Sequence, residues 1–200
     1  SLRNVQIDGN RSNVTGTSRG VWFDAPGVFK ESDIQHVTVV NCLGDGIYID
    51  AHEIKLINVS SLYNGGRGIY VGACYDIMLD HILCGWNDGN GFEAAASGAT
   101  MRIQQLDSYY NKGSGAVFHS PFWTYIARLQ CDFNFKDGAE IEVNTTSVYI
   151  EIHYPLIYGS NVDQDNFGNL NPAASGTYSD LKISGTQYPK NVRVLGNKIG

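Results

Sequence analysis

The sequence is poor in proline and in charge, and it has no long apolar run. Proline accounts for 5 of its 200 residues, and only 17% of the residues are charged. No stretch of about eighteen apolar residues is present, and the N-terminus shows no basic segment followed by an apolar one. We therefore expect no membrane insertion, and no signal peptide is visible.

Cysteine is also scarce and carries no metal-binding pattern. The 4 cysteines show no C-x-x-C spacing, which zinc sites and redox pairs use. They are too sparse for a disulfide scaffold in a chain of this length. We predict that they are small buried hydrophobic side chains.

Basic residues are outnumbered by acidic ones. The net charge is −6 and the isoelectric point is near 5.2. Nucleic-acid binding depends on Lys and Arg that neutralise phosphates, so we expect no nucleic-acid partner.

Glycine is abundant, with 23 residues, and 42% of the chain is hydrophobic. This composition predicts one all-β domain with many tight turns around a sizeable core.

A repeat of about 23 residues runs through most of the chain. A glycine opens a short apolar strand at intervals of 26, 22, 23, 24 and 23 residues: Gly20, Gly46, Gly68, Gly91, Gly115 and Gly138. An asparagine lies four residues before several of these glycines, at Asn64, Asn87, Asn111 and Asn134. An aromatic residue precedes each asparagine: Tyr63, Trp86, Tyr110 and Phe133.

The repeat predicts a parallel β-solenoid with one coil per unit. A leucine-rich repeat has a similar length, but no unit here keeps its leucine frame or has room for a helix. Stacked asparagines would form a ladder in which each amide donates to the next side-chain carbonyl. We expect Asn to adopt the left-handed backbone of the bend, the aromatic rings to stack, and Gly to permit the tight return into the next strand.

The opening "LRNVQIDGN", the coil length and the Asn ladder resemble the pectate-lyase-like superfamily, which includes pectate lyases, polygalacturonases and bacteriophage tailspikes. The resemblance covers residues 2–158 and implies a single-stranded right-handed parallel β-helix. Residues 1–158 are the predicted coils. Residues 159–200 read as a loop-rich segment with two final short strands, "DLKISG" and "KNVRVLGNKIG", as a last coil. Because no capping helix covers the first strand, we expect a piece of a longer chain or a covering partner.

Strand alternation predicts which side chains point outward after each repeat glycine. The second position after the glycine, which is the first to point outward, carries Trp22, Tyr48 and Tyr70 in successive coils. Exposed aromatic rings in a row suit the faces of sugar rings, although such ladders also stabilise a sheet. His119 falls on the same face, and Trp123 follows soon after it. We predict that these five residues bind carbohydrate.

Carboxylates on the same face are the candidate catalytic groups. Glu93 and Glu140 lie at the same position two coils apart, about 9–10 Å by strand spacing, which suits an inverting glycosidase. Asp50 and Glu93 form a second, offset pair. The alternative is that these acids are simply solvated. The polygalacturonase motifs Asn-Thr-Asp, Asp-Asp, Gly-His-Gly and Arg-Ile-Lys are absent.

A calcium-dependent lyase is less favoured, because no Arg is grouped with three acids at a convincing spacing. No metal site and no cofactor are predicted, with Ca²⁺ at the turn acids left open.

Three functions remain open at this stage. The first is a tailspike-like homotrimer, extracellular or in a virion tail, that binds and cleaves a bacterial surface polysaccharide. The second is a non-enzymatic structural or adhesive β-helix. The third is a secreted polysaccharide lyase or hydrolase that acts alone. Catalysis separates the second function from the others, and oligomeric state separates the first from the third.

Overall fold

The computed structural model describes residues 1–72, 74–95, 100–145, 147–159, 162–163, 171–172, 180–187 and 191–196, with the backbone alone for 26–30, 162–163 and 171–172. Nearly all regular structure in these ranges is β-strand, and the exception is a 3-10 helix, η1, at Arg11–Asn13. No helix within the described ranges is long and apolar enough to cross a membrane.

The strands follow one another at short intervals along the whole chain. They are β1 (Leu2–Asp8), β2 (Val21–Val40), β3 (Ile47–Leu62), β4 (Ile69–Val71), β5 (Ile77–Gly85), β6 (Phe92–Ala94), β7 (Met101–Ile103), β8 (Leu106–Tyr109), β9 (Ala116–His119), β10 (Thr124–Ile126), β11 (Leu129–Asp132), β12 (Ala139–Glu142), β13 (Ile150–His153), β14 (Pro155–Tyr158), β15 (Val162–Asp163), β16 (Asn171–Pro172), β17 (Leu181–Ser184) and β18 (Val192–Leu195).

The strands stack in parallel, coil upon coil, to form a β-solenoid. The front stack contains the first residues of β2 and β3, followed by β4, β6, β9, β12 and β17. The side stack continues from β3 through the first half of β5 to β7, β10, β13 and β18. The rear stack continues from the second half of β5 to β8, β11 and β14.

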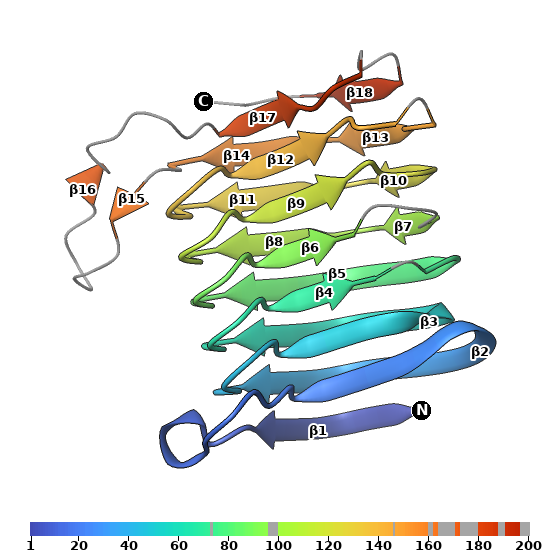
Figure 1. Cartoon of the computed structure of the whole chain (residues 1–200). Helices are drawn as coiled ribbons and strands as arrows, with labels where there is room; N and C mark the ends of the chain where they lie inside the picture. The colour runs from blue at the N-terminus through green and yellow to red at the C-terminus, as the bar shows by residue number, and fades with distance from the viewer. Residues whose placement is uncertain are drawn as a thin grey trace.

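The handedness of the coil can be followed in Figure 1. Front strands run from left to right, the strands behind them run back, and the chain climbs from β1 to β18. This path is right-handed, as the resemblance implied. The predicted all-β parallel β-helix is therefore confirmed.

The core fills the interior of the coils with the residues that alternation placed inside. On the front stack these side chains are at most 2% exposed: Ile47, Ile49, Ile69, Val71, Phe92, Ala94, Ala116, Phe118, Ala139 and Ile141. Apolar residues of the side and rear stacks complete the core. All four cysteines are buried and free, as predicted.

The Asn ladder lies at the turn from the rear stack to the front stack. Asn64 donates to Asn87, Asn87 to Asn111, and Asn111 to Asn134, each from Nδ2 to Oδ1 at 2.9 Å. These side chains are fully buried. Backbone amides also donate to the ladder, for example Asn64 N to Asn87 Oδ1 at 3.0 Å. The ladder therefore satisfies polar groups that the turn removes from water.

The structure corrects two details of the expected turn. The left-handed residue is the aromatic one before each asparagine, with φ between 52° and 58° at Tyr63, Trp86, Tyr110 and Phe133. The repeat glycine has no positive φ and is required by close approach instead. A Cβ on Gly91 would lie 1.9 Å from Ser108 Oγ and 2.6 Å from Asn111 Nδ2.

The aromatic rings at this turn stack on one another, and we call them the turn stack. Ring centroids are 5.1 Å apart for Tyr63 and Trp86, 5.6 Å for Trp86 and Tyr110, and 5.3 Å for Tyr110 and Phe133. Their interplanar angles are 11°, 9° and 19°. The stack keeps the register of successive coils alongside the Asn ladder.

The last strands extend the solenoid. β17 pairs with β12 and β18 pairs with β13, both in parallel, so they add to the front and side stacks. The short pair β15 and β16 is antiparallel. Much of the segment predicted to be loop-rich, at 164–170 and 173–179, lies outside the described residues. The division at residue 158 stays a prediction.

Candidate functional site

The residues predicted for the site fall mainly on the front stack, in two outward rows. Parallel pairing aligns Trp22, Tyr48, Tyr70, Glu93, Val117 and Glu140 in the first row. Asp24 and Asp50 lie opposite each other in the second row, where His119 and Glu142 also pair. Glu93 and Glu140 are thus two coils apart in one register, as predicted.

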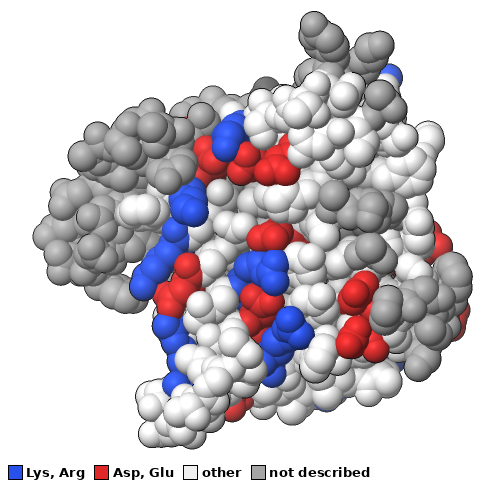
Figure 2. Space-filling model, in the orientation of Figure 1, with Lys and Arg blue, Asp and Glu red and all other residues white. Residues whose placement is uncertain are grey.

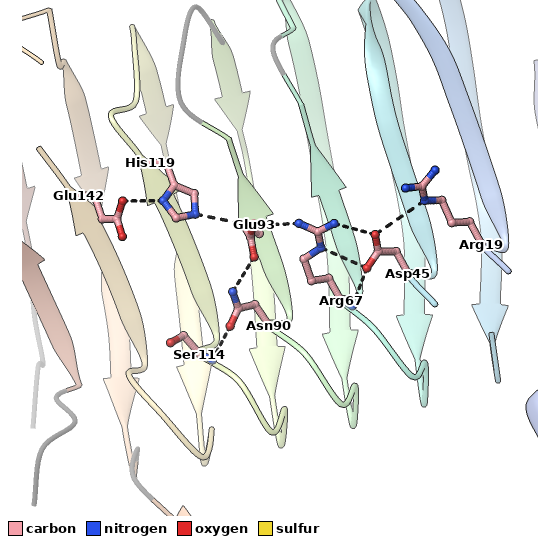
Figure 3. A network of polar contacts seen from close by, with 8 residues as sticks. All are labelled: Arg19, Asp45, Arg67, Asn90, Glu93, Ser114, His119 and Glu142. Carbon is pink, nitrogen blue, oxygen red and sulfur yellow. Dashed lines mark hydrogen bonds and ion pairs between the residues drawn. The ribbon is translucent and has the colours of Figure 1, made fainter. Parts of the chain in front are cut away.

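A chain of alternating charges crosses the front stack, and we call it the ion ladder. Its members are Arg19, Asp45, Arg67, Glu93, His119 and Glu142 (Figure 3). Arg67 contacts Asp45 Oδ2 at 2.8 Å and Glu93 Oε1 at 2.9 Å. His119 then lies 3.6 Å from Glu93 Oε1 and 2.6 Å from Glu142 Oε2. Blue and red groups alternate accordingly over this face (Figure 2).

The ion ladder fixes the charge state of its central members. Burial alone would raise the pKa of Glu93, but its contacts with His119, Arg67 and Asn90 outweigh burial and lower this pKa to about 2. The contact with Glu93 raises the pKa of His119 to about 9, against the effect of burial and with further help from Glu142. At neutral pH Glu93 is therefore ionised and His119 is protonated.

This arrangement does not favour the predicted glycosidase pair. A glycosidase pairs a carboxylic acid of raised pKa with an ionised carboxylate, and the lowered pKa of Glu93 fits only the second of these roles. Glu140 is engaged by Lys182 at 2.6 Å and accepts a hydrogen bond from Ser184 Oγ at 3.2 Å. Among the described residues, Asp50 Oδ1 is buried and has no hydrogen-bond partner. The predicted acids therefore lie on one face, and their role as an acid–base pair stays a prediction.

The aromatic row on the front stack also fits a structural role better than a sugar platform. The rings of Tyr48 and Tyr70 stack with centroids 4.9 Å apart. The guanidinium of Arg19 lies 4.0 Å from the centre of the Tyr48 ring, and that of Arg67 lies 3.8 Å from the Tyr70 ring. These contacts cover ring faces that a sugar would need. Trp22 alone in this row is well exposed, at 58%.

Because of the ion ladder, we expect the free energy of unfolding to decrease at alkaline pH. The folded pKa of His119, about 9, exceeds the ordinary value of 6.5, so its stabilisation is complete below pH 6.5 and is lost as pH rises through 9. We expect a loss on the order of 1–2 kcal/mol, reduced by solvent screening. Urea unfolding of the wild type and His119→Gln at about pH 6 and about pH 10 measures it. The stability gap between the two proteins should shrink at high pH, and an unchanged gap would contradict the assignment.

Trp123 lies on a different face from the other predicted sugar-binding residues. It stands just before β10, across the corner from β9, and is 59% exposed. The expectation that it shares a groove with Trp22, Tyr48 and Tyr70 is not met. Instead it lines a groove on the side stack with a volume of about 510 Å³, which we call the side groove. The other lining residues are Asp76, Ile77, Met78, Thr100, Met101, Arg102 and Tyr125.

The side groove follows an outward row that mixes aromatic and basic side chains. Register places Lys55, Met78, Arg102, Tyr125, Glu151 and Arg193 side by side in successive coils. Trp123 stacks on Tyr149 with ring centroids 4.8 Å apart. Tyr125 is 37% exposed, and its ring centre lies 5.1 Å from that of His153. The groove thus offers exposed rings held in place by neighbouring coils.

A cluster of titratable groups adjoins the side groove, with Tyr149 directly before β13 and Glu151 and His153 on it. This cluster was missed from the sequence. Tyr149 donates its hydroxyl to Glu151 Oε2 at 2.9 Å, and His153 Nε2 lies 2.5 Å from Glu151 Oε1. The contact with His153, followed by that with Tyr149, lowers the pKa of Glu151, and Glu151 in turn raises the pKa of Tyr149. The signal was present in "YIEIH", where alternation puts the three polar side chains on one face.

No metal site emerges from these clusters. Within the ranges that the structure describes, no three His, Cys, Asp or Glu side chains come close enough to hold a metal ion.

Comparison with known proteins gives limited information about this chain. No protein-family model and no curated protein sequence matches it. Among solved structures, it is similar to the A-module of the Azotobacter vinelandii mannuronan C-5 epimerase AlgE4, with 16% identity, a TM-score of 0.46, and coverage of 97% of this chain and 73% of that one. The A-module of AlgE6 from the same organism gives 14% identity, a TM-score of 0.36, and coverage of 98% and 74%. Likenesses this weak carry no argument about function.

Proposed function

We propose that this chain is a polysaccharide-binding β-helix that holds a sugar chain in the side groove. The observation that carries the proposal is the pairing of two exposed aromatic rings, Trp123 and Tyr125, in one groove beside Arg102. Flat apolar rings with polar neighbours suit the faces and hydroxyls of sugars. A polymer fits because the groove runs across several coils of a repetitive surface.

The charges around the side groove favour an anionic polysaccharide. The outward row holds Lys55, Arg102 and Arg193 against two carboxylates, Asp33 and Glu151. An excess of basic over acidic side chains in one row is notable on a chain of net charge −6. Guanidinium groups recognise carboxylates through paired hydrogen bonds. Uronate sugars, which carry one carboxylate per ring, therefore suit this row.

The adjoining cluster suggests a cleavage chemistry other than hydrolysis. A glycosidase needs two carboxylates, and the cluster of Tyr149, Glu151 and His153 holds one. Elimination on a uronate needs cations to neutralise its carboxylate, a base for the adjacent proton and an acid for the leaving oxygen. Arg102 and Arg193 supply the cations, and His153 and Tyr149 supply the base and the acid. Glu151 contacts both groups and so orients them.

Trp123→Ala is expected to weaken binding of an anionic polysaccharide at least tenfold, about 1.4 kcal/mol, because it removes the larger ring of the groove. Affinity electrophoresis through gels containing polygalacturonate, alginate or hyaluronate measures the loss. Trp22→Ala is the matched control, because Trp22 is 58% exposed against 59% for Trp123 but lies on the front stack. Equal retardation of Trp123→Ala and the wild type, or a loss confined to Trp22→Ala, would sink the proposal.

The setting that we propose is a tailspike, an extracellular virion fibre that assembles as a homotrimer. The repeat and the polysaccharide-suited groove support it. Native mass spectrometry is expected to give a mass of about three chains. A monomer would remove the tailspike assignment and leave the side groove intact. Binding without any product would instead make the chain a recognition or adhesive β-helix.

A further inference from the structure

The turn stack ends abruptly at Tyr63. Asn41 is the residue in register with Tyr63 in the preceding coil, since Val40 pairs with Leu62 and the amide of Asn41 donates to the carbonyl of Leu62. Asn41 keeps the same left-handed backbone, with φ 55° against 58° at Tyr63. One face of Tyr63 is stacked on Trp86, while the position that another ring would occupy on the other side holds a short amide. The turn stack therefore lacks a ring at Asn41, and we call this position the missing rung.

A groove opens at this missing rung, and we call it the turn groove. Its volume is about 910 Å³, and its lining includes Asn41, Tyr63 and Trp86. Tyr63 is 42% exposed there, although its ring belongs to the turn stack. Arg11, projecting from η1, forms an ion pair with Asp88 at the other side of the groove. Residues of several successive coils, together with η1, thus line the groove beside this aromatic face.

The charges that line the turn groove balance. Arg11 and Lys112 both contact Asp88, the latter at 2.9 Å, and Asp8 also lines the groove. The lining therefore carries two acidic and two basic side chains. Planar polar groups from Asn10 and Asn41 add hydrogen-bonding capacity. An uncharged ligand with many hydroxyl groups fits this balance better than an anion.

We propose that the turn groove is a second carbohydrate site, in which a neutral sugar ring stacks on Tyr63 at the missing rung. The sugar would occupy the place of the absent aromatic side chain, with its hydroxyls toward Asn41 and the Arg11–Asp88 pair. The volume accommodates more than one sugar residue. This inference goes beyond the proposed function, because it concerns another edge of the solenoid and another charge class of sugar.

The test uses Trp86 as a local reporter, because it lines the turn groove and stacks on Tyr63. Trp22 and Trp123 are replaced by Phe, so that Trp86 is the only tryptophan left of the 3 in the chain. The protein is titrated with maltohexaose, cellohexaose and mannohexaose. A saturable change in Trp86 fluorescence is expected with at least one of them. No change with any of the three, up to about 10 mM, overturns the inference.

Two variants in the same background decide whether the signal comes from the missing rung. Tyr63→Ala removes the platform, and Asn41→Tyr fills the rung with a ring while keeping the platform. Both are expected to raise the dissociation constant at least tenfold. Tyr75→Ala is the matched control, since Tyr75 is 43% exposed but lies outside the turn groove. Unchanged binding in Asn41→Tyr overturns the inference even if Tyr63→Ala fails to fold. The test is independent of sugar binding in the side groove, because Trp123 is already replaced by Phe in this background.

Discussion

Asn87→Ala is expected to lower the free energy of unfolding by about 3–5 kcal/mol, more than any other single substitution that we propose. Asn87 is fully buried and accepts hydrogen bonds from Nδ2 and the backbone N of Asn64. It donates to Asn111 Oδ1 and to the carbonyl of Ser61. Alanine would remove these four buried hydrogen bonds on both sides of the ladder, in a turn that water does not reach.

Urea unfolding followed by circular dichroism measures this loss. Asn13→Ala is the control, because Asn13 is exposed in η1, and its replacement should change stability by about 0.5 kcal/mol or less. Asn87→Gln should remain nearly as destabilising as alanine, since the longer amide does not fit the 2.9 Å spacing of the ladder. A loss below about 1 kcal/mol in Asn87→Ala would show that the ladder does not hold the coils together.

His153→Gln and Tyr149→Phe are each expected to reduce cleavage of a uronate polysaccharide by about 10²–10⁴-fold, with binding retained. His153→Gln removes the base, and Tyr149→Phe removes the hydroxyl that protonates the leaving oxygen. Because elimination leaves a carbon–carbon double bond conjugated with the uronate carboxylate, ultraviolet absorbance of the product follows the rate. The polysaccharides that retard the protein in gels are the substrates to assay first.

Variants of the front stack serve as controls for this reaction. His119→Gln and Glu93→Gln alter the ion ladder but lie away from the side groove, so their rates should match the wild type once their stability is taken into account. New reducing ends without absorbance, lost in Glu93→Gln, would instead place a hydrolase on the front stack. That outcome would restore the pair of Glu93 and Glu140 and contradict the proposed chemistry.

The fold could be predicted from the sequence because its determinants are local and repeated. The glycine period sets the coil, alternation sets the core, and Asn64, Asn87, Asn111 and Asn134 mark the ladder. Each of these features recurs in several coils, so a chance match in one coil matters little. The backbone of the turn could not be predicted as well. Side-chain preference suggested that the ladder Asn takes the left-handed conformation, but the turn places it one residue earlier, at Tyr63 as well as at Asn41 in the preceding coil.

The site was harder to predict because its openness depends on contacts between coils. Alternation placed Tyr48, Tyr70 and Glu93 on an outward face, but it says nothing of the guanidinium groups of Arg19 and Arg67 that cover them. Those arginines stand directly before the repeat glycines Gly20 and Gly68, where Asp45 and Asn90 also precede their own glycines. This alternation of residue types before the glycine was the available signal for the ion ladder.

The corner of the solenoid explains why the position of Trp123 was mistaken. The turn between β9 and β10 follows no repeat, so strand alternation cannot be continued through it. Counting from His119 suggests that Trp123 stays near the front stack. In the structure the chain has turned onto the side stack by that point, and Trp123 stacks on Tyr149 of the next coil. Irregular corners of this kind decide which face carries an open groove.

The fluorescence of the 3 tryptophans shows which surface binds the polysaccharide, because each of them reports on a different surface. Trp123 lines the side groove, Trp22 lies on the front stack, and Trp86 lines the turn groove. Three proteins, each keeping one tryptophan with the others replaced by Phe, are titrated with the anionic polysaccharide that binds best. We expect a saturable change in the protein that keeps Trp123 and none in the protein that keeps Trp22. A change confined to Trp22 would contradict it and return the sugar to the front stack.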